Sequence, residues 1–248
     1  MSVSHITEVI RRSEQGVTRP FFCRASDHKL YWVKGASAGK RALCCEWIAG
    51  RLARELNLPI PNFRVLNVDR DLVEFSARDD IADLGHGQVF GSEHVENVQE
   101  ITVRDIKRVP ERLQLQILLF DWWIKNSDRT LGEKGGNPNL LWDVASENKI
   151  HMIDHNLAFD GDFQSASFLQ SHIFSESRDA ASSESLLDAR SAMADIQPLA
   201  AKIWREVPEH WLFLDSEKSM PLDFTHESVE TTLNRLQNDF EKEWMGQQ

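Results

Sequence analysis

The sequence predicts an α+β fold of two lobes, a small β-rich N-terminal lobe and a mainly helical C-terminal lobe. Short runs of aromatic and β-branched residues, with one amphipathic helix among them, fill the first third of the chain. A segment that is apolar on most sides lies near the middle, and helical periodicity dominates the remainder. We place the boundary near residue 90 and expect lobes of residues 1–90 and 91–248.

The N-terminal lobe is predicted to hold four strands and one helix. The runs 19–24 and 29–34 flank a short polar turn and predict a hairpin. Residues 41–56 follow, with apolar residues at helical spacing. Two further strands are expected at 63–68 and 72–76, around a charged turn.

The C-terminal lobe is predicted to be organised around a buried helix at residues 110–124, because that segment is apolar on most of its surface. A polar loop, 125–139, leaves this helix, and two short strands follow at 140–144 and 149–153. Two amphipathic helical segments are expected nearer the C-terminus, at 196–207 and 226–244.

Composition excludes several classes of protein. A formal net charge of −11 disfavours a protein that coats nucleic acid, because phosphate backbones require clustered Lys and Arg. The longest nearly uninterrupted apolar run, near 115–124, is far shorter than the roughly 20 residues that span a bilayer. Cys23, Cys44 and Cys45 form no CxxC pair and fit a reducing compartment. We therefore expect a cytoplasmic protein with neither membrane nor direct nucleic-acid partners.

The polar loop and the strands after it carry the clearest chemical signal. A hairpin brings the residue before its first strand close to the residue after its second, so Asn139 and Asp154 are expected to meet. Their oxygens suit Mg²⁺, and Asp128, on a loop held by a buried helix, would lie beside them. A metal site with a further carboxylate is what transfer of a phosphoryl group from ATP requires.

A cation for the ATP phosphates is expected from Lys34, which ends an apolar strand and would be oriented by Glu46 on the next helix. Gly16 and Thr18, in a turn placed just before the first predicted strand, could cover the phosphates. Taken singly, each of these residues has an ordinary alternative, such as a surface lysine, a solvated glutamate or a turn aspartate. Their joint occurrence in this order is what favours the functional interpretation.

These segments resemble the HipA-like kinases, a bacterial family distantly related to the phosphatidylinositol kinases. The resemblance spans roughly residues 10–165 and is carried by GVTRPFFCRASDHKLYWVKG, RALCCEWIAGRLARELNLPIPNFRVL, FGS, LFDWWIKNSDR, NPNLLW and IHMIDHNLAF. It implies a two-lobed protein-kinase-like fold with the nucleotide held in a cleft between the lobes. It also implies ATP and Mg²⁺ as ligands and a protein serine or threonine as acceptor.

Carried over by position, the resemblance assigns Asp128 as the catalytic aspartate and Asn139 and Asp154 as Mg²⁺ ligands. Arg129 would belong to the catalytic loop and support that loop or a phosphate. Lys34 would bind the α- and β-phosphates of ATP, steadied by Glu46. The acceptor protein and any role in a toxin–antitoxin system are not implied.

The sequence departs from the usual pattern in two respects. His155 and Asn156 follow the expected metal aspartate, Asp154, where Phe-Gly is usual in kinases. Asp128 and Asn139 are eleven positions apart, where most kinases have about five. The extra residues, 130–136, include three glycines that could form a bulge, and Asn137 is then a rival ligand. Three alternatives therefore stay open: a pseudokinase that binds nucleotide or a partner, a small-molecule or lipid kinase, and a metal hydrolase using His151, Asp154 and His155.

Overall fold

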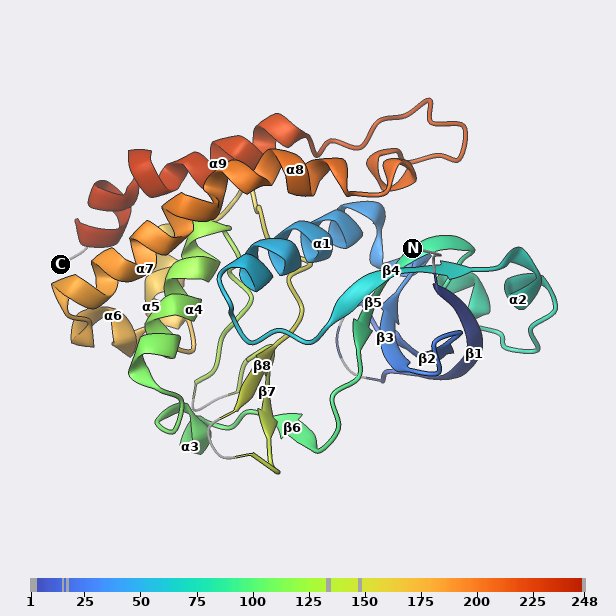
Figure 1. Cartoon of the computed structure of the whole chain (residues 1–248), viewed down its shortest axis with the longest axis horizontal. Coiled ribbons are helices and arrows are strands. Elements are labelled where there is room, and N and C mark those ends of the chain that lie inside the picture. Colours follow the sequence, from blue (N-terminus) through green and yellow to red (C-terminus); the bar gives the residue numbers. More distant parts are fainter. Residues whose placement is uncertain (1–3, 15, 17, 133–134, 147–148, 247–248) are drawn as a thin grey trace. The chain divides into compact units, whose positions relative to one another are not determined.

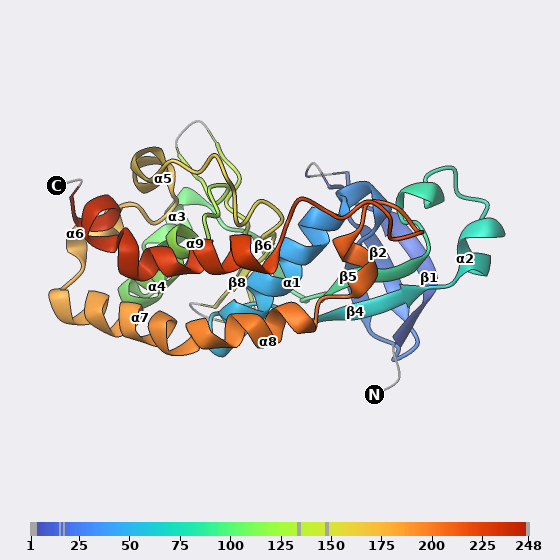
Figure 2. The same ribbon diagram turned by 90° about the horizontal axis from the view of Figure 1, so that it is seen from above.

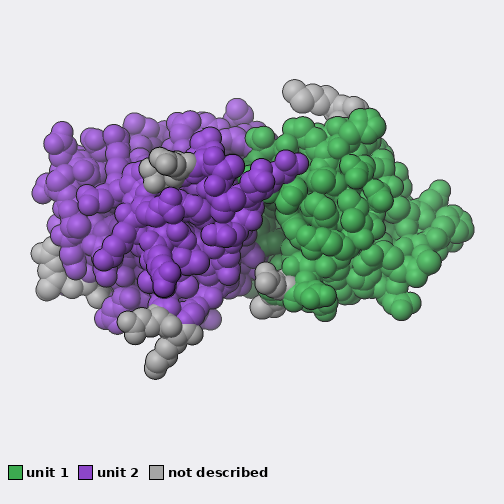
Figure 3. Space-filling view, turned by 90° about the horizontal axis from the view of Figure 1, so that it is seen from below, with its two compact units in different colours: residues 1–47, 61–95, 207–223 green, residues 48–60, 96–206, 224–248 purple. Residues whose placement is uncertain are grey.

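The computed structural model describes residues 4–14, 16, 18–132, 135–146 and 149–246, and the chain divides into two compact units (Figures 1 and 3). The first unit comprises residues 1–47, 61–95 and 207–223, and the second comprises residues 48–60, 96–206 and 224–248. The segments of the two units alternate along the sequence, and the first change from one unit to the other falls within the helix α1 (Lys40–Glu55).

The first unit is built on a closed barrel of five strands in the order β1-β2-β3-β5-β4 (Figure 1). Neighbouring strands are antiparallel except β1 and β4, which run parallel where the barrel closes. The strands are β1 (Ser4–Arg12), β2 (Phe21–Ala25), β3 (Leu30–Lys34), β4 (Phe63–Val68) and β5 (Gly87–Glu93). Short helices complete the unit: η1 (Ala36–Ala38), α2 (Arg70–Glu74), η2 (Ile81–Asp83) and η4 (Glu209–Leu212).

The barrel core follows from side-chain alternation along the strands. In β2, Phe21, Cys23 and Ala25 are buried and alternate with partly exposed residues, as expected of a strand with one face on a core. The predicted hairpin of β2 and β3 is confirmed, with Phe21 opposite Val33. The predicted helix is confirmed as α1, and the predicted strand 63–68 is β4.

The predicted strand at 72–76 is wrong, because this segment begins as the short helix α2 and leaves the sheet. Leu72 and Val73 are partly buried, and both pack against the barrel core. In a strand, these two neighbouring side chains would point to opposite faces of the sheet. The strand that pairs with β4 is instead β5, from further along the sequence. A short segment with only three apolar residues does not by itself distinguish helix from strand.

An unpredicted strand, β1, precedes all the predicted ones. Its nine residues are mostly exposed or partly exposed, with only Ile6 buried, so the segment has mixed polarity and lacks a strand-like apolar run. The turn that contains Gly16 and Thr18 therefore joins β1 to β2, rather than preceding the first strand as predicted.

The second unit holds a three-stranded antiparallel sheet and most of the helices (Figures 1 and 2). The predicted central helix is confirmed as α4 (Glu111–Trp123), whose last nine residues include eight buried ones, and it packs against α6, α7 and α9. The strands are β6 (Val98–Glu100), β7 (Leu140–Asp143) and β8 (Ile150–Met152). The helices are α3 (Val103–Ile106), α5 (Ser165–Ser171), α6 (Glu176–Ala180), α7 (Ser183–Ile196), η3 (Gln197–Leu199), α8 (Ala200–Arg205), α9 (His226–Asn238) and η5 (Phe240–Met245).

The predicted hairpin of this unit is confirmed as β7 and β8, with Leu140 opposite Met152. The helical segment expected at 196–207 is interrupted, with a 3₁₀ turn in η3 before α8. The segment expected at 226–244 consists of α9 followed by the π-helix η5. Within the described part of the chain, no helix is both long enough and apolar enough to cross a membrane.

Candidate active site

The loop that carries Asp128 is fixed to the end of α4 by Asn126. The backbone N–H of Asn126 donates to the Asp121 carbonyl at 2.8 Å, and its side-chain amide donates to Asp121 Oδ1 at 2.9 Å. Both side chains are fully buried. Asp128 therefore stands two residues beyond an anchored point, as expected for a loop leaving a buried helix.

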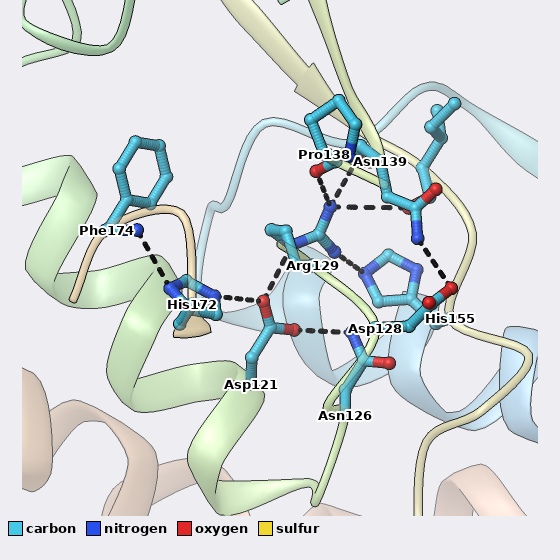
Figure 4. A network of polar contacts seen from close by, with 10 residues as sticks. Asp121, Asn126, Asp128, Arg129, Pro138, Asn139, His155, His172 and Phe174 are labelled. Carbon is cyan, nitrogen blue, oxygen red and sulfur yellow. Dashed lines mark hydrogen bonds and ion pairs between the residues drawn. The ribbon is translucent and has the colours of Figure 1, made fainter. Parts of the chain in front are cut away.

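Asp128 is held by two asparagine side chains. Its Oδ2 accepts from the amide of Asn137 at 2.7 Å and from the amide of Asn139 at 3.1 Å (Figure 4). Burial raises the pKa of Asp128, and the nearby charge of Asp154 raises it further, although the hydrogen bond from Asn139 acts in the opposite direction. A partly buried carboxylate with a raised pKa is a better proton acceptor than an exposed one.

The insertion after Asp128 folds back on itself, so it does not separate Asp128 from Asn139. The N–H of Thr130 donates to the Asn137 carbonyl at 2.9 Å, and Gly132 and Gly135 exchange backbone hydrogen bonds of 3.1 and 3.0 Å. This closed turn accounts for the long spacing between Asp128 and Asn139 in the sequence. It agrees with the bulge that the glycines in this segment led us to expect. The residues at its tip, 133–134, lie outside the described part of the chain.

Asn139 and Asp154 flank the hairpin and are brought together as predicted. The N–H of Ile153 donates to the Asn139 carbonyl at 3.0 Å, one step beyond the last strand pair. Both residues have left-handed backbones, with φ of +47° at Asn139 and +58° at Asp154. Asn and Asp tolerate this conformation better than other non-glycine residues, so the backbone here favours residue types that are also oxygen ligands.

This donor set fits Mg²⁺, which prefers a few carboxylate and amide oxygens and keeps several waters. Asp154 and Asn139 could hold the ion, with Asp128 beside them. Among the described residues, no group of three or more His, Cys, Asp and Glu side chains is placed to hold a metal. The hydrolase alternative, which needs a histidine-rich cluster, therefore gains no support from that part of the chain.

Arg129 supports the loop from inside the protein. Its side chain is fully buried; Nε donates to Asp121 Oδ2 at 2.6 Å, and Nη1 donates to the Asn139 carbonyl. Nη2 lies 3.3 Å from His155 Nε2. Of the two roles expected for Arg129, these contacts favour support of the loop over contact with a phosphate.

Lys34 and Glu46 form the predicted ion pair within the first unit. Lys34 ends β3 and Glu46 lies on α1, and Nζ of the lysine donates to Oε1 of the glutamate. Both residues are buried, with exposed fractions of 7% and 3%. Gly35 follows directly, and a Cβ there would lie 2.1 Å from the Leu84 carbonyl oxygen, so only glycine fits beside Lys34.

Gly16 and Thr18 lie in the turn between β1 and β2, in the same unit as Lys34. Gly16 has φ of +77°, a conformation that favours glycine, and is exposed, whereas Thr18 is partly buried. The predicted site residues thus form two groups: Lys34, Glu46, Gly16 and Thr18 in the first unit, and Asp128, Arg129, Asn139 and Asp154 in the second.

Sequence reasoning missed two residues that contact this loop, Asp121 and His172. Asp121 had a signal, because a carboxylate within an apolar, buried helix must have a partner. His172 had none, since its contact with Asp121 spans 51 positions of the sequence.

Comparison with known families agrees with this arrangement. The profile of a family described as HipA-like kinase matches residues 6–244. The chain belongs to the HipA-like kinase family. Membership supports a kinase-type phosphotransferase and implies ATP as a ligand, usually with a divalent metal. The match extends well beyond residue 165, so the helical C-terminal region is part of the family's pattern.

A comparison with solved structures finds two kinases among the matches. The crystal structure of the Helicobacter pylori proinflammatory kinase CtkA is similar with a TM-score of 0.56 and 11% identity, covering 97% of this chain and 95% of that one. The FAT and kinase domain of CtTel1 gives a TM-score of 0.39 and 14% identity over 94% of this chain and 22% of that one. A search of curated proteins finds no match. The CtkA likeness supports a kinase-like fold.

Proposed function

We propose that this HipA-like kinase transfers the γ-phosphate of ATP to a serine or threonine hydroxyl of a protein, with Mg²⁺ as cofactor. The observation that carries the proposal is the position of Asp128, held by the Asn139 amide and within electrostatic reach of Asp154. In this position Asp128 would accept a proton beside oxygens of Asn139 and Asp154 that would bind the metal, an arrangement that suits phosphoryl transfer.

In the proposed reaction, Asp128 accepts the proton of the acceptor hydroxyl as its oxygen forms a bond to the γ-phosphorus. The bond from that phosphorus to the β,γ-bridging oxygen breaks, and ADP leaves with the electron pair. Asn139 and Asp154 would hold Mg²⁺, which supplies positive charge to the phosphates. Arg129 would act indirectly, by keeping the Asn139 carbonyl in place.

The first unit would be the nucleotide-binding lobe and the second the catalytic lobe. Lys34, oriented by Glu46, would neutralise the α- and β-phosphates, because an ammonium with a buried stem presents a compact charge. The turn of Gly16 and Thr18 would offer backbone N–H groups to the phosphates, as anion-binding turns do. We further propose a cytoplasmic protein of bacterial origin, without nucleic-acid or membrane partners.

A pseudokinase is the second candidate, and the long insertion after Asp128 was the feature that favoured it. That insertion closes on itself through Thr130 and Asn137 and leaves Asp128 and Asn139 in contact, which favours activity. A small-molecule or lipid acceptor is the other alternative to a protein hydroxyl.

The deciding experiment is calorimetry of ATP binding with and without Mg²⁺, followed by mass spectrometry for transferred phosphate. Asp154→Ala is expected to remove most of the Mg²⁺-dependent affinity. The exposed helix residue Asp195 provides the control, since Asp195→Ala removes the same charge from the same unit. Binding without phosphate transfer to any protein would favour a pseudokinase, and absence of ATP binding would overturn the proposal.

Asp128→Ala separates chemistry from binding. We expect kcat to fall by about 10²–10⁴-fold, because the proton acceptor is lost, while ATP affinity changes less than about threefold. Rapid-quench measurement of ADP formation gives the first quantity and calorimetry gives the second. An unchanged rate would exclude Asp128 as the proton acceptor.

A further inference from the structure

A buried network in the second unit joins the end of α4 to the segment that follows α5 (Figure 4). Asp121 lies at its centre, with Oδ1 accepting from Asn126 at 2.9 Å and Oδ2 accepting from Arg129 at 2.6 Å. His172 contacts the same Oδ2 through Nε2 at 3.1 Å. The side chains of Asp121, Arg129 and His172 are all fully buried, so this network excludes water and its geometry is fixed by the protein.

The contacts of His172 define its tautomer. The backbone N–H of Phe174 donates to Nδ1 at 3.1 Å, and a backbone N–H can act only as a donor. Nδ1 is therefore the unprotonated nitrogen, and the ring hydrogen of neutral His172 is on Nε2, where it is donated to Asp121. Burial lowers the pKa of His172, which keeps the ring neutral, and the Asp121 hydrogen bond only partly opposes this.

The network reaches both flanks of the hairpin through Arg129. Its Nη1 donates to the Asn139 carbonyl and lies 3.5 Å from the carbonyl oxygen of Ile153, the residue before Asp154. The backbone carbonyl of Arg129 accepts in turn from the N–H of Ile173 at 3.0 Å. The segment 172–173 thus contacts α4 through the His172 side chain and the loop of Asp128 through the Ile173 N–H.

We infer that His172 is a positioning residue for the phosphotransfer site: its Nε2–H fixes Asp121, Asp121 fixes the Arg129 guanidinium, and Arg129 fixes the carbonyls beside Asn139 and Asp154. This inference rests on the proposed function for its catalytic consequence. Its structural part, the directed hydrogen bond from His172 to Asp121, stands independently of that function.

Two variants with the same functional group test the direction of this bond. His172→Gln places an amide N–H near the former Nε2 and keeps the donor to Asp121. His172→Asn places an amide oxygen near the former Nδ1, so it keeps the acceptor for Phe174 N–H and loses the donor to Asp121. Because both replace the ring by a carboxamide, each is the control for the other.

We expect His172→Asn to lower kcat at least tenfold, with KM for ATP changed less than threefold, and His172→Gln to retain at least a third of kcat. Without ligands, hydrogen exchange should be at least fivefold faster at the amides of Thr130 and Ile173 in His172→Asn than in His172→Gln. Equal kcat and equal exchange in the two folded variants, or a larger loss in His172→Gln, would overturn the inference.

A measurement on the unaltered protein covers the case in which a variant does not fold. Long-range ¹H–¹⁵N spectra should show His172 with a bare Nδ1 and a protonated Nε2; the opposite tautomer would overturn the inference. If the protein transfers no phosphate, the proposed function fails, yet the exchange and tautomer results still decide whether His172 directs its hydrogen bond to Asp121.

Discussion

The two units each place a buried ion pair at their group of candidate site residues, and the pairs differ in construction. In the first unit, Lys34 and Glu46 have side chains that are 9% and 4% exposed. In the second unit, Arg129 and Asp121 have side chains with no exposure at all. The guanidinium of Arg129 also contacts the backbone carbonyl of Asn139 and the ring of His155.

This difference follows from the chemistry of the two cations. A guanidinium offers five N–H donors in a rigid plane, so one side chain can join a helix, a loop and both flanks of a hairpin. An ammonium is a compact charge on a flexible stem that a phosphate oxygen can approach. The contacts of Arg129 therefore stabilise the protein itself, whereas the role proposed for Lys34 is to bind the phosphates of a ligand.

The largest expected effect is on folding, in the second unit. Arg129→Ala should lower the free energy of unfolding by about 3–5 kcal/mol, because Asp121 remains buried without its cation. Burial raises the pKa of Asp121, but Arg129, together with the hydrogen bond from His172, holds it below its usual range. Urea denaturation followed by tryptophan fluorescence measures the change.

Arg129→Lys sharpens this result, since it keeps the positive charge and loses the planar fork. We expect a smaller loss of stability, about 1–3 kcal/mol, with a loss of phosphotransfer as large as in Arg129→Ala. If Arg129→Ala is as stable as wild type to within about 1 kcal/mol, or if Arg129→Lys is fully active, the structural role assigned to Arg129 is wrong.

A smaller effect is expected on binding, in the first unit. Lys34→Met should lower the affinity for ATP by about 10- to 100-fold. This loss corresponds to about 1.5–3 kcal/mol, the contribution of a hydrogen bond to a charged group. Calorimetry measures this directly. Lys29, which precedes the other end of β3 and pairs with Glu93, provides the matched control, and Lys29→Met should change affinity less than twofold.

The double variant Lys34→Met/Glu46→Gln separates stability from binding, because it removes both charges of the buried pair. We expect it to regain stability relative to Lys34→Met while ATP binding stays weak. Recovery of ATP affinity in the double variant would contradict the role proposed for Lys34 and make the pair structural, like that of Arg129 and Asp121.

Much of the second unit's site could be predicted from the sequence because its geometry is local. A hairpin fixes the distance between its flanks, so Asn139 and Asp154 follow from two short strands and the turn between them. The Lys34–Glu46 pair was also predictable, from a strand followed after a short connection by a helix. The closed turn after Asp128 was predictable from the glycines within it.

The parts that sequence reasoning missed depend on distant contacts or on weak patterns. His172 reaches Asp121 across 51 positions, and no local periodicity records such a contact. The strand β1 has one buried residue, so it lacks the alternation that identifies strands. The segment of the helix α2 was predicted as a strand because Leu72 and Val73 are apolar. Their packing on the barrel core, which distinguishes a helix from a strand here, cannot be read from the sequence.

The smallest effect decides between Asn139 and the rival ligand Asn137. Both donate to Asp128, but Asn139 is buried, with 6% exposure, and its backbone is fixed by Arg129 and Ile153, whereas Asn137 is exposed. We expect Asn139→Ala to raise the Mg²⁺ concentration for half-maximal activity about tenfold, the equivalent of about 1.4 kcal/mol. Asn137→Ala should raise it about twofold or less, since it loses only one hydrogen bond to Asp128. The reverse order would assign the metal to Asn137 and would show that the exposed amide directly after the inserted residues has replaced the buried one.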